Sequence, residues 1–423
     1  MMLATLLNYM DRQVLPQIAT ELKDAYGLDD ERYGQVAGNF AQAFALGSIF
    51  FGFVADRVGP RLLYPVVLVG WSAAGLATPL MRDPAFAAQF ARPDEPGSGP
   101  YYWLLYCRTL LGFFEAGHWP CALLTARQIL TAQDRPLGNG LLQSGASLGA
   151  ILVPLYVMAV RKLGGGWEVA FWTIGAAGLL WVPLWLALVR RGVLDAPASR
   201  ERERPEALPT RLAEPPVGHA PGSPTPFDWV RFVRMYATLF AVNLGLNVSW
   251  QFIREWLPKF LKESQGFSAD TADLVAPVYY ISAECGCFAG GALVLWLVAR
   301  GRAVHSARVT GYALFALITL SAALAPLAGG WAGVTLIVLA GAGILGLHPL
   351  YYALIQELPA KHMAILSGLL TAVGWSVVAQ MQKGMGAHIK ATGNYDIGFV
   401  LAGLAPLVGL AALLVLWPRE RRS

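Results

Sequence analysis

Charged residues lie inside two stretches of the chain that are otherwise apolar. Asp11 and Arg12 interrupt the first stretch, and Arg108 and Glu115 lie inside a later one. In the hydrocarbon core of a bilayer a charge costs about 3 kcal/mol or more, so such residues generally face an internal cavity and mark an ion or substrate pathway. We therefore take these four residues as the first candidates for a functional site.

The spacing of Arg108 and Glu115 is suited to a proton switch. Seven residues make about two helical turns, which puts both side chains on one face with their Cα atoms about 10 Å apart. Ionised Glu115 would be attracted to Arg108, whereas neutral Glu115 would leave Arg108 free. We expect this pair to take part in proton coupling.

Arg12 has the chemistry of an anchor for an anionic solute. Its guanidinium stays charged and presents a planar fork that can bind a carboxylate through two hydrogen bonds. Asp11 lies about 100° further round the same helix, where it could act as a counter-ion or as a second protonation site. A purely structural reading stays open, in which the four charged residues neutralise one another and hold helices together.

The composition indicates an integral membrane protein. The 423 residues are 56% hydrophobic and only 14% charged, with a mean hydropathy of +0.48, far more apolar than a soluble domain. Repeated apolar runs of about 20 residues predict helices that cross about 30 Å of hydrocarbon, and they exclude a barrel of short alternating strands. The net charge of +5 fits the basic loops of a membrane protein and needs no nucleic-acid partner.

The hydropathy pattern predicts an all-α bundle of twelve transmembrane helices in two sets of six. The predicted spans are 1–21, 33–54, 62–81, 101–125, 137–160 and 168–189, followed by 230–257, 271–298, 306–327, 331–355, 362–382 and 396–417. Residues 1–190 and 229–423 form the two halves, and the proline- and arginine-rich segment 191–228 reads as a linker. Lys and Arg are roughly twice as frequent on the linker side, which predicts a cytoplasmic linker and cytoplasmic termini in a bacterial-type inner membrane.

A turn after the second predicted helix carries small and charged residues at fixed spacing: Gly52, Asp56, Arg57, Gly59 and Arg61. It resembles the G-x-x-x-D-R-x-G-x-R signature between helices 2 and 3 of the major facilitator superfamily. We expect the glycines to allow close helix packing and Asp56 to meet a helix N-terminus or an arginine. The resemblance implies two pseudo-repeats that rock against each other in alternating access. The matching stretch, residues 290–308, lacks the aspartate, which suggests an asymmetric lock between the halves.

Two further motifs, NYMDRQVL at residues 8–15 and CRTLLGFFEAGHWP at residues 107–120, resemble the anion:cation symporter family. The similarity is strongest to its hexuronate and hexonate branch. The resemblance implies that Tyr9, Arg12 and the helix 5 amide Gln143 contact the substrate. It also implies that Asp11 and Glu115 carry protons and that Arg108 belongs to the same machinery.

The second half offers a polar stripe as a further candidate. Asn243, Asn247, Trp250, Gln251 and Arg254 recur along one predicted helix. Asn247 and Gln251 could meet sugar hydroxyls, or the stripe could equally be hydrogen-bonding glue between helices. Arg254 and Glu255 lie near the outer end of this helix, which favours a structural or gating role.

Four other residues have weaker assignments. Trp375 and His348 are candidates to line a cavity. Glu284 is either another protonation site or paired within the second half, and His118 is expected to be a packed neutral histidine. The four cysteines lie in apolar segments and predict neither a disulfide nor a metal site.

Together these features predict a proton-coupled secondary active transporter that imports a sugar acid, a hexuronate or an aldonate. Its partners would be a small anionic solute, protons and the lipid bilayer, and we expect a monomer with no cofactor besides the coupling proton. An exchanger or symporter of another organic anion, such as an aromatic acid, a dicarboxylate or a phosphate ester, is the main alternative. A non-transporting membrane sensor is a remote one. No phosphate-binding loop or nucleophile constellation points to an enzyme.

Overall fold

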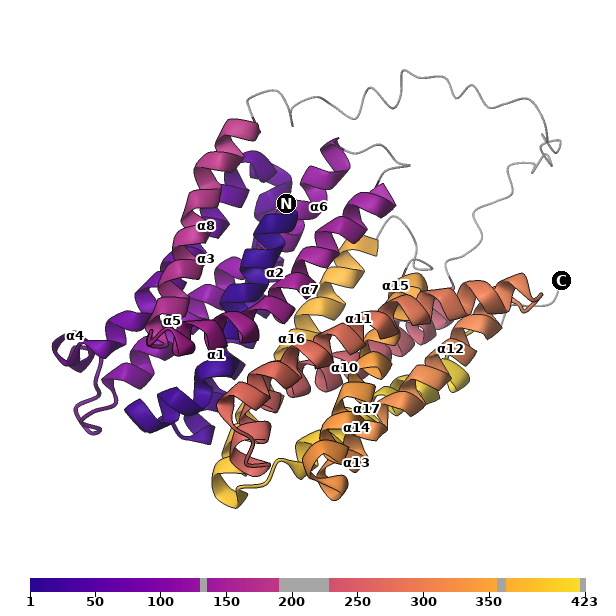
Figure 1. Ribbon diagram of the computed structural model, residues 1–423. Coiled ribbons are helices and arrows are strands. Elements are labelled where there is room, and N and C mark those ends of the chain that lie inside the picture. Colours follow the sequence, from indigo (N-terminus) through magenta and orange to yellow (C-terminus); the bar gives the residue numbers. More distant parts are fainter. Residues whose placement is uncertain (130–134, 190–227, 356–362, 419–423) are drawn as a thin grey trace.

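The computed structural model describes residues 1–129, 135–189, 228–355 and 363–418, and Figure 1 shows their arrangement. The predicted linker, residues 191–228, lies almost entirely outside this described part. Within it, regular structure is helical apart from one isolated bridge between Arg92 and Glu95.

The first half forms one group of helices, coloured indigo to magenta in Figure 1, and the second half forms a group beside it, coloured orange to yellow. The first group consists of α1 Met2–Tyr26, α2 Asp30–Val58, α3 Pro60–Ala77, the 3₁₀ helix η1 Thr78–Arg82, α4 Pro84–Ala88, α5 Gly99–Glu115, α6 His118–Ile129, α7 Arg135–Lys162 and α8 Glu168–Leu188. The second consists of α10 Trp229–Lys259, the π-helical η2 Phe260–Ser264, α11 Ala269–Ala299, α12 Val304–Thr319, α13 Ser321–Ala328, α14 Gly330–Gly346, α15 His348–Ile355, α16 Met363–Thr392 and α17 Asp396–Val415.

Each of the twelve predicted spans coincides with one of these helices or with a consecutive pair. Eight segments of the described chain are long and apolar enough to cross a membrane, so the protein is a multi-pass membrane protein and the count of twelve stays a prediction. The predicted spans outside those eight are α1, α5 with α6, α10 and α16. These are the helices that carry Arg12, Glu115, the polar stripe and Trp375, and such polar content suits helices around a shared interior.

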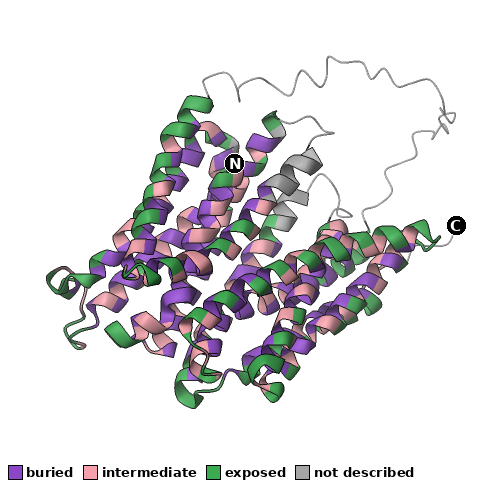
Figure 2. Ribbon diagram, viewed as in Figure 1, coloured by how far each residue is buried: buried purple, intermediate pink, exposed green. Residues whose placement is uncertain are grey.

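Large apolar side chains cover the outside of the bundle. Leu180 on α8, Phe288 on α11 and Leu327 on α13 are all exposed, and Figure 2 shows exposed residues along the outward faces of the helices. A water-soluble monomer rarely exposes so much contiguous apolar surface. In a bilayer these faces contact lipid.

The two halves contact each other most closely along α2 and α16. A Cβ atom built at Gly34 of α2 would lie 2.5 Å from the carbonyl oxygen of Gln382 and 2.7 Å from the Cα of Gly386, both on α16. Only glycine permits this approach, because any side chain would overlap the facing backbone. The interface therefore depends on small residues at matched positions on both helices.

The bundle has two distinguishable ends. We call the end near residues 189 and 228 the linker end, and the opposite end, near Tyr26 and Lys259, the far end. Figure 1 shows the two groups of helices diverging toward the linker end.

Ion pairs join the halves at the far end. Lys23 lies 3.2 Å from Glu263, and Lys259 lies 3.0 Å from Asp30. Lys390 reaches Glu31 at 2.7 Å. Among the described residues, all ion pairs between the halves lie at this end, so the structure is closed at the far end.

Candidate functional site

Arg12 and Glu115 form a buried ion pair where α1 meets α5. The Nε atom of Arg12 donates to Oε2 of Glu115 at 2.8 Å, and Nη2 lies 2.6 Å from the same oxygen. Nη2 also donates weakly to Oδ1 of Asn8 at 3.5 Å. Glu115 is the last residue of α5, directly before the break that separates α5 from α6. One carboxylate oxygen therefore neutralises the Arg12 guanidinium.

Aromatic rings surround the Arg12 guanidinium. Its Cζ atom lies 5.1 Å from the ring centre of Tyr9 and 5.0 Å from that of Phe44. Trp375, from the second half, contributes a third ring at 5.7 Å and packs against Phe44 at 4.4 Å between ring centres. Such rings stabilise a cation without competing for its hydrogen-bond donors. The structure thus brings together Tyr9, Arg12, Glu115 and Trp375, all singled out from the sequence.

Arg108 does not pair with Glu115, contrary to expectation. Its Nη1 donates to the backbone carbonyl of Asp11 at 3.3 Å and its Nη2 to that of Arg12 at 3.2 Å. The physical reason is Pro16, which lies inside α1 and has no N–H to bond to the carbonyl of Arg12 four residues earlier. Arg108 fills that vacancy and so positions the helix segment that carries Arg12.

Asp11 points away from Arg12. Both of its carboxylate oxygens are buried without a hydrogen-bond partner among the described residues. A Cβ atom built at Gly75 of α3 would lie 3.0 Å from Oδ1. A buried carboxylate without partners is costly in its ionised form. This environment is compatible with the predicted role of Asp11 as a protonation site, which stays a prediction.

His118 is a packing residue, in keeping with the prediction. Its Nε2 lies 3.1 Å from Oγ1 of Thr5, and its Nδ1 lies 3.0 Å from the hydroxyl of Tyr64. Both ring nitrogens are thereby satisfied in a fully buried site, which holds α6 against α1 and α3.

Of the two asparagines in the polar stripe, Asn243 bonds to another helix and Asn247 bonds within its own helix. Asn243 donates to the carbonyl of Leu370 on α16 at 2.9 Å, and Asn247 donates to the side-chain oxygen of Asn243 at 2.9 Å. Gln251 differs, because its Oε1 is buried without a partner among the described residues. Gln251 is thus a predicted substrate contact with an acceptor that no described residue occupies.

Two other second-half candidates can be placed. Glu284 accepts a hydrogen bond from Ser147 of the first half, so pairing within the second half is not found among the described residues, and the alternative of a protonation site stays a prediction. His348 contacts the carbonyl of Ile344 at 3.1 Å and lies 6.3 Å, between ring centres, from Trp250.

The loop motif is only partly described. Arg61 donates to the carbonyl of Val189 at 3.1 Å and thus ties α3 to the end of α8. Gly59 has a φ of 77° and ends α2, and Arg57 lies over the ring of Phe53. A Cβ atom at Gly52 would meet nothing within 4 Å, so the expected close packing there is absent. The side chains of Asp56 and Gln143 lie outside the described part.

Sequence patterns missed two contacts between the halves. Gln13 donates to the hydroxyl of Tyr280 at 2.9 Å, and Tyr33 donates to Oε1 of Glu255 at 2.7 Å. Glu255 and its neighbour Arg254 are both buried. No local sequence signal pairs residues so distant in the chain. The adjacent charges of Arg254 and Glu255, in a helix that also bears polar residues, did mark this part of the helix as unusual.

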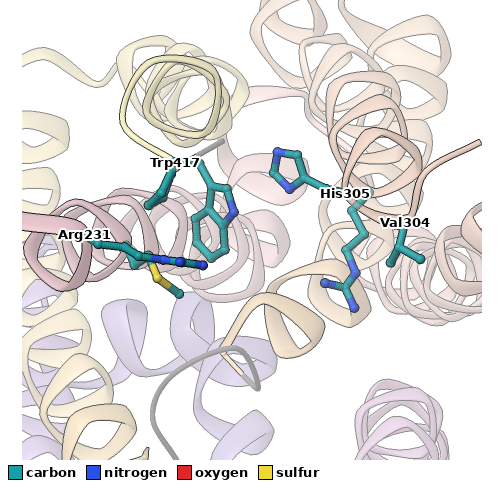
Figure 3. Close-up of a pocket in the computed structure, with 7 residues that line it drawn as sticks. Arg231, Val304, His305 and Trp417 are labelled. Carbon is teal, nitrogen blue, oxygen red and sulfur yellow. The ribbon is translucent and has the colours of Figure 1, made fainter. Parts of the chain in front are cut away.

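A separate pocket opens at the linker end of the second half. Figure 3 shows Arg231, Val304, His305 and Trp417 around it, and the ring of His305 stacks on that of Trp417 with 6.0 Å between centres. Among the described residues, the pocket is lined by α10, α12 and the residues that follow α17. Because no described residue of the first half lines it, we do not assign the site of transport to this pocket.

Comparison with known proteins agrees with this fold. Residues 1–380 match the model of the Major Facilitator Superfamily. The chain is 26% identical to the probable sulfoacetate transporter of Cupriavidus necator over 99% of this chain and 92% of the relative. It is 25% identical to the hexuronate transporter of Bacillus subtilis over 98% and 93% of the two chains.

A solved structure shows the same fold. The inward open conformation of the xylose transporter from E. coli superposes with a TM-score of 0.72, covering 100% of this chain and 96% of that chain at 13% identity. Family and relatives alike are transporters rather than enzymes. The chain belongs to the major facilitator superfamily of membrane transporters, and its relatives fit the hexuronate and hexonate branch that its helix 1 and helix 4 motifs resemble.

Proposed function

We propose that the protein is a proton-coupled secondary active transporter that imports a sugar acid, a hexuronate or an aldonate, by alternating access. The observation that carries this proposal is the buried pair between Arg12 and Glu115. The name of the Bacillus subtilis relative supports the substrate class.

The pair links anion binding to proton binding. An arginine that already donates to Glu115 cannot present its fork fully to a substrate carboxylate. Protonation of Glu115 removes its charge and weakens the pair, which releases the Arg12 guanidinium for the substrate. Substrate and proton therefore bind together, and each leaves more easily once the other has left. Arg108 holds the backbone of this segment, and Asp11 is the candidate for a second proton.

The closed far end defines one state of the transport cycle. We assign this end to the periplasm and the linker end, with both termini, to the cytoplasm of a bacterial-type inner membrane. The structure then corresponds to an inward-facing state, in which ion pairs such as Lys23 with Glu263 close the outer side. Rocking of the two halves about the α2–α16 contact would break these pairs and open the outer side.

The remaining substrate contacts are assigned on chemistry. Tyr9 and Trp375 flank the guanidinium and can pack against the apolar face of a sugar ring. Gln251 has a free acceptor for a hydroxyl, and Gln143 supplies the amide that the family resemblance implies. We expect the protein to act as a monomer with no cofactor other than the proton.

A second candidate is transport of another small organic anion. The asparagines of the stripe are occupied by α16 and by each other, which leaves fewer groups than expected for sugar hydroxyls. The similarity to the probable sulfoacetate transporter points the same way. Both candidates use the Arg12 anchor and differ in the rest of the ligand.

Counterflow in proteoliposomes tests the proposal. Liposomes loaded with unlabelled galacturonate should accumulate external labelled galacturonate with the wild-type protein and not with Arg12→Ala. Arg12→Lys keeps the charge but loses the fork, so it should retain only a small fraction of the activity. Saturable counterflow of wild-type size in Arg12→Ala would exclude the anchor. Counterflow that only non-sugar anions can drive would favour the second candidate.

A further inference from the structure

Arg254 is a buried guanidinium with few partners among the described residues. It is 4% exposed, and its Nε and Nη1 atoms are buried without a partner among the described residues. Among the described residues it forms an ion pair with the neighbouring Glu255, whose Oε2 lies 3.7 Å from Nη2, beyond hydrogen-bond range. Burying a charge in this way is costly unless a partner compensates it. The arrangement therefore calls for an anion that is not part of the chain.

The acids around Arg254 are already engaged. Oε1 of Glu255 accepts a hydrogen bond from Tyr33 at 2.7 Å, and Glu115 is held by Arg12. Glu115 is nevertheless within electrostatic range of Arg12, Arg108 and Arg254. Arg12 on α1 and Arg254 on α10 therefore act on the same carboxylate, that of Glu115, from opposite halves.

Polar groups with free capacity surround the same place. The Oε1 atom of Gln251, three residues before Arg254, and the hydroxyl of Tyr279 are both buried without a partner in the described part of the chain. Tyr279 and Tyr280 both lie within electrostatic range of Arg254. A cation with adjacent unused donors and acceptors is the composition of a binding subsite rather than of a packed core.

We propose that Arg254 is a second anion anchor and that the substrate is a dianion. The fitting class is a sugar acid with a carboxylate at each end of the chain, or a short carboxylic acid with a second acidic group. This inference rests on the proposed function, in which Arg12 binds the first carboxylate. When Glu115 takes up a proton and releases Arg12, a dianion satisfies both guanidiniums and bridges the two halves. A monoanion leaves Arg254 unsatisfied.

Galactarate and galacturonate form a matched pair of probes, because both have six carbons and they carry two carboxylates and one. We would measure their affinities by calorimetry on the purified full-length protein at one pH. Wild type should bind galactarate more tightly. Arg254→Gln should weaken galactarate at least tenfold while changing galacturonate less than twofold, and retained galacturonate binding shows that the variant is folded. Arg300→Gln, at an exposed arginine on Trp296, is the control and should change neither affinity.

Several results would overturn the inference. One is tighter binding of galacturonate by wild type, and another is an equal effect of Arg254→Gln on both ligands. If Arg254 serves only to neutralise Glu255, the double variant Arg254→Gln/Glu255→Gln would regain galactarate affinity, whereas a true anchor cannot be restored in this way. Wild type that binds neither ligand would contradict the proposed sugar-acid function itself, a failure distinct from the loss of the second anchor alone.

Discussion

Glu115→Gln should uncouple substrate binding from pH. The change keeps the size of the side chain and mimics the protonated acid, so Arg12 is freed permanently from the pair that holds it at 2.6–2.8 Å. In the wild type a sugar acid must displace an ionised Glu115 or bind with a proton. For each proton taken up on binding, the apparent affinity falls about tenfold, or about 1.4 kcal/mol, with every unit that the pH rises. This holds over the range where Glu115 is ionised in the empty protein.

The assay is calorimetric affinity for galacturonate at pH 5.5, 6.5 and 7.5. One coupled proton predicts up to about a 100-fold loss of affinity across this range for the wild type, and less than about a twofold change for Glu115→Gln. Glu168→Gln is the matched control, because it removes another buried carboxylate of the first half that pairs with Arg82 and not with Arg12, and it should keep the slope. A Glu115→Gln variant that keeps the wild-type slope, or a Glu168→Gln variant that loses it, would refute the assignment of Glu115.

Three further predictions follow from the packing and the far end. Arg108→Leu should lower the melting temperature and weaken substrate binding, because the carbonyl of Arg12 loses its donor. In a Pro16→Ala background the same change should lower the melting temperature clearly less, because the restored N–H supplies the bond. Additive losses of melting temperature in the double variant would contradict this. Gly34→Leu should destabilise the protein by about 1–3 kcal/mol through overpacking against α16. Gly52→Leu on the same helix should not, because a Cβ there meets nothing within 4 Å. Equal melting temperatures of the two variants would refute the close contact. Burial raises the pKa of Glu263, but Lys259 and Lys23 outweigh this effect and hold its pKa below the ordinary 4.5. Its pairing therefore stabilises the closed far end above pH 4.5 and is lost as the pH falls below that value. The distance between spin labels at the exposed positions Asp94 and Thr392 should stay constant from pH 7.5 to pH 5 and lengthen only below pH 4.5. Lengthening of this distance already near neutral pH would contradict the prediction.

The sequence predicted the helices and the members of the site better than it predicted their pairing. Apolar runs long enough to cross a bilayer leave little choice of structure, because every backbone polar group must bond within the segment. Arg12 and Glu115 were found for the same reason, since charges are too costly in such runs to lack a purpose. The coincidence of all twelve spans with observed helices follows from these two constraints.

The partner of Arg108 required geometry that spacing alone does not contain. A long side chain takes the nearest unsatisfied acceptor, and Pro16 creates one at the carbonyl of Arg12. The sequence does carry this signal, because Pro16 lies four residues after Arg12.

Contacts between the halves had no such signal. The hydrogen bond from Ser147 to Glu284 and the burial of Arg254 depend on how the two halves meet. Glu255, near the end of α10, is buried where Tyr33 of α2 donates to it from the other half. Tertiary packing of this kind is not encoded in local periodicity.

The most direct test of the account is proton movement with substrate. Proteoliposomes that enclose a pH-sensitive dye would receive galacturonate, galactarate or a neutral hexose from outside, with labelled uptake followed in parallel. Proton symport through Glu115 predicts internal acidification with a sugar acid, none with the neutral hexose, and none with Glu115→Gln. Uptake of labelled sugar acid by the wild type without acidification would contradict proton coupling and return Glu115 to a structural role.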